Sequence, residues 1–292
     1  MPLEGAGQLA RTWVGHDLEP FTVEAQESVL RAFSKATRQT DAVFTDTAAA
    51  REQGLKGLLA PPTFLFCLER HAPQPDLLLE LLGADPRQRL LHAEQAFTYH
   101  QPVHAGDVLT FRQRLADVFE KKGGDLQFAV RTTVVTNQHD QRVAELRHVL
   151  TLVNRPIQPA PRQTRVEDDA TAPLELRTPP ITRLDLALYA CASGDFNPVH
   201  IDSDFAREAG FDDVFVHGML VMAQAARPLT DWTRTGLSQL SIRFERITHI
   251  GDRLRCLAQP GERDANGRHS VSLAVHDQHG ERKASGTAVI AA

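Results

Sequence analysis

The chain repeats one pattern at a distance of 156 residues. Residues 45–54, TDTAAAREQG, lie over residues 201–210, IDSDFAREAG, without a gap. In the same register, residues 60–64 (APPTF) lie over residues 216–220 (VHGML). Units of solenoid proteins are about 20–50 residues long. Two copies at this much longer period therefore indicate a duplicated domain that packs as an internal pseudo-dimer.

Later parts of the two copies match at smaller offsets. Residues 104–107 (HAGD) resemble 249–252 (HIGD), and residues 137–142 (NQHDQR) resemble 277–282 (DQHGER). These short polar stretches are typical of turns between strands. The falling offset means that the first copy holds extra residues, and we expect an additional helix or overhanging loop between Ala72 and Leu91.

A proline-rich stretch separates the two copies. Residues 154–180 contain six prolines and little apolar periodicity, which is typical of a semi-extended linker. A chain of 292 residues is long enough for two ordinary domains. We therefore expect an N-terminal domain at 1–153, a linker at 154–180 and a C-terminal domain at 181–292.

Each copy places helical segments before a run of strands. Alternating β-branched and aromatic residues predict strands at 95–100, 108–115 and 128–135 in the first copy, and at 240–245, 253–257 and 271–275 in the second. Helices followed by antiparallel strands indicate the α+β class.

Composition excludes several classes of function. The net charge of -5 gives no basic surface for nucleic acid. Cys67, Cys191 and Cys256 lack the spacing of a thiolate metal site or a disulfide framework. No apolar run reaches the roughly 18 residues of a membrane helix, and the start lacks a signal-peptide pattern. We expect a cytoplasmic protein.

The most informative segment is residues 189–202, YACASGDFNPVHID. Gly194 and Pro198 make one continuous helix through it unfavourable, so Asp195 and His200 are expected to meet around a turn. A short helix is expected next, capped by Asp202 or Ser203 and closed by Gly210.

An aspartate beside a histidine suits the addition of water to a conjugated thioester. One group of the pair takes a proton from water, and the pair then delivers a proton to Cα. The unperturbed pKa of histidine, ~6.5, suits this exchange near neutral pH. The enolate oxygen also needs hydrogen-bond donors. An apolar helix is expected to begin near Gly218, whose backbone N–H is the candidate for the oxyanion hole.

Other interpretations of these residues stay open. Asp195 and His200 could form a turn cap, or could join Asp202 in a weak metal site. His217 at a helix start is more simply a residue that bonds the backbone. Four arginines, which are more often a solvated strand face, could instead contact phosphates of coenzyme A or an acyl carrier protein: Arg243, Arg246, Arg253 and Arg255.

The order S-G-D-x-N-P-x-H-x-D, followed by H-G-M, resembles the MaoC-like (R)-specific enoyl-thioester hydratases and dehydratases. The resemblance implies a double hot-dog fold, in which each antiparallel sheet wraps round a central helix. It also implies Asp195 and His200 as the catalytic pair, Asn197 supporting them, and Gly218 in the oxyanion hole. Some members of the family carry a serine nine residues after the H-G-M histidine, where this chain has Ala226.

The N-terminal half resembles the partner domain of the same superfamily. As a whole, the chain resembles a fusion of the two subunits of mycobacterial-type (3R)-hydroxyacyl-carrier-protein dehydratases. This implies that the first half is non-catalytic and shapes the acyl site. The implied substrate-binding residues are His217, Met219, Pro62 and Thr63. In the 156-residue register, Asp195 falls on Gln39 and His200 on Phe44, so the first copy lacks the pair.

The expected activity is reversible hydration of trans-2-enoyl thioesters to (3R)-3-hydroxyacyl thioesters, or the reverse dehydration, without metal or other cofactor. The expected partner is an acyl-CoA or acyl-carrier-protein substrate, with no nucleic acid or membrane, while a homodimer stays open. One alternative is a mesaconyl-CoA-type hydratase of dicarboxylyl thioesters, which an arginine at the acyl carboxylate would distinguish. Another is a non-catalytic acyl-thioester binding protein.

Overall fold

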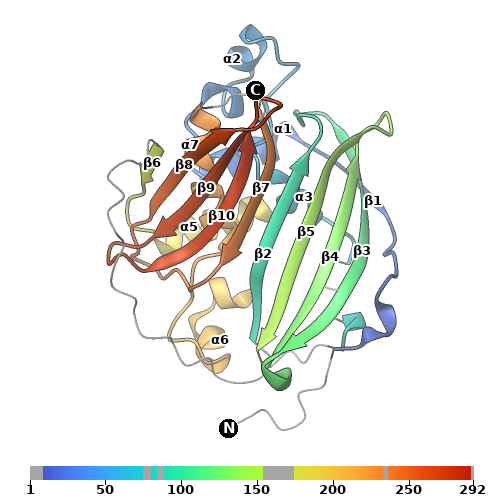
Figure 1. Cartoon of the computed structure of the whole chain (residues 1–292), viewed down its shortest axis with the longest axis vertical. Coiled ribbons are helices and arrows are strands. Elements are labelled where there is room, and N and C mark those ends of the chain that lie inside the picture. The colour runs from blue at the N-terminus through green and yellow to red at the C-terminus, as the bar shows by residue number, and fades with distance from the viewer. Residues whose placement is uncertain (1–8, 75–79, 84–88, 154–173, 233–235, 291–292) are drawn as a thin grey trace.

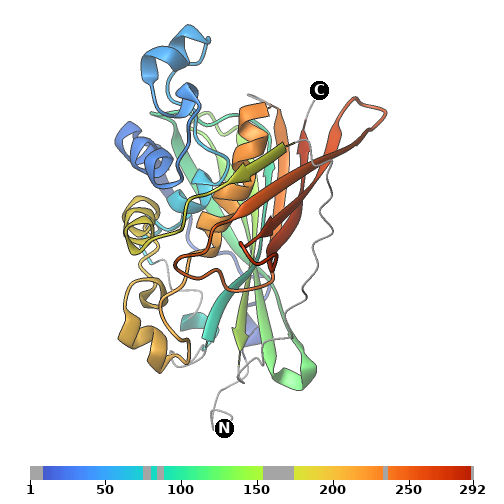
Figure 2. The same ribbon diagram turned by 90° about the vertical axis from the view of Figure 1, so that its left-hand side faces the viewer.

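The ten strands of the described residues belong to one antiparallel sheet. The computed structural model describes residues 9–74, 80–83, 89–153, 174–232 and 236–290. The strands lie in the order β1-β3-β4-β5-β2-β7-β10-β9-β8-β6, and each neighbouring pair is antiparallel. The helices lie on one side of the sheet (Figures 1 and 2). The sheet and its covering helices confirm the predicted α+β double hot-dog.

The first half supplies the five strands on one side of the sheet centre. Its strands are β1 (Phe21–Glu24), β2 (Arg89–Tyr99), β3 (Val108–Lys121), β4 (Leu126–Thr136) and β5 (Arg142–Val153). Its helices are α1 (Glu27–Ala36), α2 (Thr47–Glu52) and α3 (Phe64–Glu69), with 3-10 turns η1 (Arg11–Trp13), η2 (Ala42–Phe44) and η3 (Lys122–Gly124).

The second half supplies the other five. Its strands are β6 (Leu174–Arg177), β7 (Leu237–Phe244), β8 (Arg255–Arg263), β9 (His269–His276) and β10 (Arg282–Ile290). Its helices are α5 (Arg183–Ser193), α6 (Ser203–Glu208) and α7 (Gly218–Trp232), with the 3-10 turn η4 (Pro198–His200). The strands of each half thus follow one order outward from the central pair β2 and β7.

The structure has the 156-residue register that the sequence predicts. Turn η2 lies over η4 and helix α2 over α6. Asp46 and Asp202 cap these two helices in the same way, because each carboxylate accepts from the backbone N–H groups two and three residues later. The predicted cap at Asp202 is therefore confirmed. Gly210, at the predicted helix end, has φ of 81°.

The predicted linker needs a correction at its end. Residues 154–173 lie outside the described part of the chain. Leu174–Arg177, however, form strand β6, which pairs with β8 from Leu174↔Ala258 to Arg177↔Arg255. The alternating LELR pattern presents apolar side chains on one face of this strand, so the second unit of the sheet begins before residue 181. The prolines on either side obscured this short strand.

The predicted insertion between Ala72 and Leu91 is described only in part. Residues 75–79 and 84–88 lie outside the described residues. Leu82 between them is fully buried and packs in a small cluster with Leu9, Leu115 and Leu152. Strand β2 already begins at Arg89, so the end of the predicted insertion belongs to the sheet.

The central helices of the two halves differ in length. Helix α7 has 15 residues, whereas α3 has six and ends at Glu69. One hydrophobic cluster joins residues of both helices with both halves of the sheet, including Phe64, Leu220 and Leu240. Among the described residues, no helix is both long and apolar enough to span a bilayer. Because α3 is shorter than α7, it can cover less of the inner face of its half of the sheet.

Candidate active site

Asp195 lies at the point where helix α5 ends. A capping box starts this helix, since Thr182 and Asp185 each accept from the other's backbone N–H. Gly194 ends it with φ of 70°, a left-handed conformation that glycine adopts without strain. The chain thereby turns out of the helix, and the N–H of Asp195 donates to Ser193 Oγ at 3.2 Å.

Asn197 shapes the turn between the two catalytic candidates. Its side-chain oxygen accepts from the N–H of Val199 at 3.3 Å and so caps η4, the turn that carries His200. Its own N–H donates to Asp195 Oδ1 at 3.4 Å. Asn197 therefore acts on the geometry of both Asp195 and His200, in agreement with a supporting role.

The ring of His200 is held in one tautomer. Its Nδ1 lies 2.7 Å from the carbonyl oxygen of Phe215, and a carbonyl only accepts, so Nδ1 carries the proton. The lone pair is then on Nε2, the nitrogen turned away from that carbonyl. The side chain is buried, and its ring packs edge-on against Phe215. His200 is thus presented as a neutral base.

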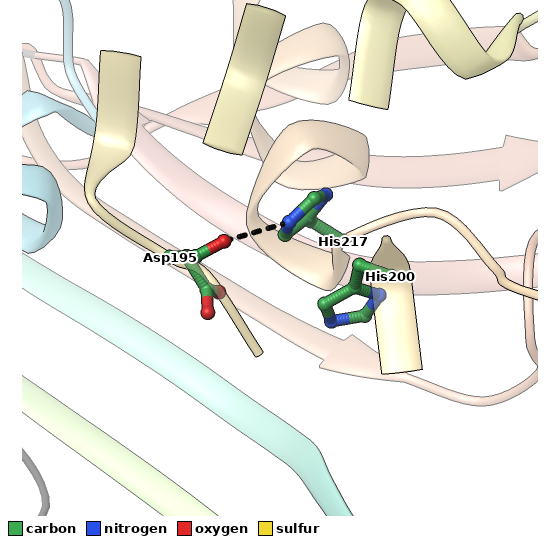
Figure 3. A group of neighbouring side chains, drawn as sticks. All are labelled: Asp195, His200 and His217. Carbon is green, nitrogen blue, oxygen red and sulfur yellow. Dashed lines mark hydrogen bonds between the residues drawn. The ribbon is translucent and has the colours of Figure 1, made fainter. Parts of the chain in front are cut away.

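His217 completes the cluster. Its Nε2 lies 3.1 Å from the backbone carbonyl of Asp195, and its ring centre lies 4.0 Å from that of His200 (Figure 3). One ligand atom each from Asp195, His200 and His217 lie within 4.8 Å of one another. The bond to Asp195 agrees with the structural role favoured for His217, because it fixes the loop that carries the carboxylate.

Charges and burial set the pKa values of this cluster. Burial raises the pKa of Asp195, but His217, His200 and Arg70 lower it by more, so the pKa lies below its ordinary value. Burial lowers the pKa of His200 below 6.5, against the opposing effect of Asp195. At neutral pH the pair is therefore an ionised carboxylate beside a neutral imidazole.

The N-terminus of helix α7 lies beside the cluster of Asp195, His200 and His217. Helix α7 begins at Gly218, and the first backbone N–H groups of a helix have no carbonyl partner within it. A Cβ at Gly218 would lie 3.3 Å from the ring of Phe244 on β7, so this ring leaves little room for a side chain at position 218. Met219 is buried in the core beside it. The site thus offers donors for a developing anion.

Two residues of the first half reach the site, and the sequence did not reveal them. The Cβ of Arg70, the residue after α3, lies 3.5 Å from the position of a Cβ on Gly194. The ring of His92 on β2 lies 5.0 Å from that of Phe244. Both lie more than a hundred residues from Asp195 in the chain. The pairing of β2 with β7 brings His92 near, and the contact of α3 with α5 brings Arg70 near.

The first half's predicted substrate residues lie at the opposite end of α3. The carbonyl of Pro62 accepts from Tyr99 Oη at 2.5 Å, and Thr63 is buried just before the helix. In the repeat register Pro62 and Thr63 match Gly218 and Met219. They therefore belong to the half of the chain that lacks the catalytic aspartate and histidine. Phe44 and Gln39 are buried at the positions of His200 and Asp195. Substrate contact by Pro62 and Thr63 stays a prediction.

Several other interpretations can now be compared with contacts. Asp202 caps α6 and does not join the cluster of possible metal ligands, where His217 stands instead. Three of the four arginines pair with glutamates: Arg243 with Glu94 at 2.6 Å, Arg246 with Glu281 at 3.9 Å and Arg255 with Glu175 at 3.1 Å. These ion pairs favour solvated surface positions over phosphate contacts, and of the three paired arginines Arg243 and Arg255 lie on strands.

A metal or a water molecule would meet the same three residues. Nδ1 of His200 and Nε2 of His217 both bond backbone carbonyls, which leaves one nitrogen of each ring beside the Asp195 carboxylate. Backbone bonds of this kind orient metal ligands and catalytic histidines alike. The expectation of a site without metal stays a prediction.

Comparison with known families covers both halves. Residues 12–146 match the FAS1-like, dehydratase domain region, and residues 166–282 match the MaoC like domain. The chain thus carries a FAS1-like dehydratase region in its N-terminal half and a MaoC-like dehydratase domain in its C-terminal half. The coarse class of activity, hydratase or dehydratase, follows from these two matches.

Solved structures with this fold span the whole chain. A MaoC-like dehydratase superposes with a TM-score of 0.81 at 21% identity, covering 96% of this chain and 98% of the other. A MaoC-like dehydratase of Phytophthora capsici gives 0.72 at 18% identity, covering 95% and 96%. A Mycobacterium tuberculosis protein with a double hotdog fold gives 0.68 at 14% identity, covering 99% of both. At these identities the likeness establishes the fold alone.

Curated relatives match about half of the chain or less. A UPF0336 protein of Streptomyces avermitilis is 32% identical over 119 residues, which cover 40% of this chain and 79% of the relative. This relative thus aligns with one part of the longer chain.

Proposed function

We propose that the chain catalyses the reversible syn hydration of trans-2-enoyl thioesters to (3R)-3-hydroxyacyl thioesters. The observation that carries the proposal is the arrangement of Asp195 and His200, an ionised carboxylate and a neutral imidazole with oriented Nε2, within 4.8 Å of each other. Both groups can bond one water, which is what a dyad for water addition requires.

The reaction can be written on these atoms. Nε2 of His200 takes a proton from water while the carboxylate of Asp195 holds it, and the water oxygen bonds C3 of the acyl group. The electron pair of the double bond moves toward the thioester carbonyl, whose oxygen the N–H groups at Gly218 stabilise. A proton returns from the dyad to C2, on the face that received the oxygen, so one water has been added.

A hydration assay tests this proposal. The enzyme is incubated with trans-2-butenoyl and longer enoyl thioesters, on coenzyme A and on acyl carrier protein, and loss of the conjugated absorbance is followed. We expect turnover on at least one carrier and (3R) configuration of the product in chiral separation. Formation of the (3S) product, or saturable binding without turnover on either carrier, would contradict it; the second result would favour a binding protein.

The pH profile offers a second test. The proposed reaction needs ionised Asp195 and neutral His200, so activity is lost as pH falls through the pKa of His200. Burial places that pKa below 6.5. We therefore expect kcat/KM, which reports the free enzyme, to keep more than half of its plateau value at pH 6.5. A profile that has already fallen below half at pH 6.5 would show that the imidazole is not held neutral.

A further inference from the structure

A set of polar side chains crosses the inner face of the first half's sheet, at the level where α3 ends. We call it the polar row, and its members, each at most 7% exposed, are Glu69, Gln95, Gln113, Arg131, Thr133 and His148. The ladder pairs Gln113 with Thr133 between β3 and β4, Arg131 with His148 between β4 and β5, and His148 with Gln95 between β5 and β2. The row therefore runs without interruption toward the central strands.

Glu69 anchors one end of the row. Its carboxylate accepts from Gln113 Nε2 at 3.1 Å, from Thr133 Oγ1, and from Arg131 at 2.7 Å. The same nitrogen of Arg131 lies 3.2 Å from Nδ1 of His148. Because a guanidinium only donates, Nδ1 of His148 is the acceptor and its proton is on Nε2. These contacts fix the orientation of His148.

The other end of the row is less well hydrogen-bonded. Within the described part of the chain, neither Nε2 of His148 nor Oε1 of Gln95 makes a hydrogen bond of good geometry, although both atoms are buried and the Gln95 side chain lies close enough to His92 to raise the pKa of that ring. The two residues face each other directly in the ladder between β5 and β2. A buried donor and a buried acceptor left side by side cost several kcal/mol together, on the order of 1–3 each, so a hydroxyl group, which accepts from His148 Nε2–H and donates to Gln95 Oε1, is favoured there.

This end of the row lies next to the candidate active site. The ring of His148 lies 4.1 Å from that of His92, and the ring of His92 lies 5.0 Å from that of Phe244. Phe244 in turn lies against Gly218. Burial lowers the pKa of His92 to about 4, so at neutral pH it is an uncharged neighbour of the row. Ring contacts therefore connect the oxyanion candidate to His148.

The second half shows that the fold does not require these polar residues. His148 lies six residues after Arg142. Its counterpart in the second half is Ala288, which lies six residues after the matching Arg282. Ala288 pairs with Val271 and Leu240 as His148 pairs with Arg131 and Gln95. Ala258 pairs with Leu273 as Gln113 pairs with Thr133. The five second-half residues are at most 3% exposed and belong to the hydrophobic core.

We propose that the inner end of the polar row, Gln95 and His148, binds an oxygen atom at the far end of a short acyl chain whose thioester lies at Asp195 and His200. The inference rests on the proposed function and deepens it, because it names the acyl class: chains ending in a hydroxyl rather than in a methyl group. An ionised carboxylate only accepts hydrogen bonds, so it would leave Oε1 of Gln95 without a donor. An apolar tail of greater length would meet buried polar atoms instead of a hydrophobic tunnel.

Binding of saturated thioesters tests the inference without requiring turnover. Butyryl-, succinyl- and 4-hydroxybutyryl-pantetheine share the arm common to both carriers and differ only at the acyl end. We expect calorimetry to give about 10- to 100-fold tighter binding of the 4-hydroxybutyryl ligand than of the butyryl ligand, as one buried hydrogen bond provides. The succinyl ligand, whose carboxylate only accepts, should gain less than the 4-hydroxybutyryl ligand.

Two variants locate the effect. His148→Leu and Gln95→Met should each bring the favoured ligand to within about threefold of the butyryl ligand, whose own affinity stays unchanged. Thr151→Val is the control, since Thr151 is a buried polar residue on the same strand whose hydroxyl bonds the carbonyl of Gln127 at 3.2 Å; it should keep the preference. Urea unfolding checks that all three variants fold.

Two results would overturn the inference. One is equal affinity of all three ligands for the unaltered enzyme, which would mean that water alone satisfies Gln95 and His148. The other is a preference that survives in both variants. Failure of the enoyl thioesters to be hydrated would instead count against the proposed function, because the binding measurement involves no reaction.

Discussion

Replacing Asp195 by Asn, or His200 by Gln, is expected to lower kcat for hydration by about 10²- to 10⁴-fold, the usual contribution of a positioned acid or base. Asn lacks the negative charge with which Asp195 holds the attacking water, and Gln lacks the oriented Nε2 lone pair that the bond to Phe215 provides. Because the two groups act on one water, the double variant should lose little more activity than the worse single variant. Initial rates with the best enoyl thioester measure all three.

Matched controls separate this effect from damage to the fold. Asp17→Asn and His100→Gln change the same residue types at exposed positions, where Asp17 pairs with Arg114 and His100 with Glu145. Both should keep full activity. If either Asp195→Asn or His200→Gln keeps kcat within threefold of the unaltered enzyme, that residue is not part of the dyad.

Arg131→Met is expected to destabilise the protein by about 3–5 kcal/mol, because it leaves the carboxylate of Glu69 buried without its counter-charge. The Glu69 side chain is 1% exposed and that of Arg131 is 8% exposed. Changing both, in Glu69→Gln/Arg131→Met, should recover most of the loss, since no uncompensated charge remains. Urea unfolding with a double-mutant cycle gives the coupling free energy.

The exposed pair of Arg147 and Glu94 is the control for this cycle. The two side chains are 46% and 28% exposed and lie 3.1 Å apart on the sheet's outer face. Arg147→Met should cost less than about 1 kcal/mol. A cost for Arg131→Met that is equally small would mean that water reaches Glu69, and the polar row would then be less enclosed than its burial indicates.

Local patterns were sufficient to predict much of the fold. The repeat register, the cap at Asp202 and the buried helix from Gly218 each depend on residues within a few positions of one another, and all agree with the structure. The strand segments predicted from alternation overlap β2, β3, β4, β7, β8 and β9, while residues 100, 245 and 253–254 lie just outside these strands. Asp195 and His200 could be proposed as a pair because one turn of chain contains both.

The rest depended on contacts that no local pattern records. A bulge between His92 and Glu94 gives β2 an extra residue, and as a result His92 and Gln95 share the inner face. Simple alternation would have placed them on opposite faces. To predict the polar row, one must know which face of four strands is buried. To place Arg70 near the site, one must know where α3 ends. These facts arise from pairing across the sheet.

The junction between β2 and β7 has a consequence for how this enzyme could specialise. A dimer of identical subunits must carry every substitution twice, once on each side of its axis. Here the two sides of the sheet are encoded separately and held together by the ladder from Glu94↔Arg243 to Thr98↔Gln239. One side could therefore acquire buried polar groups for recognition while the other kept the chemistry, so that duplication released the two tasks to evolve independently.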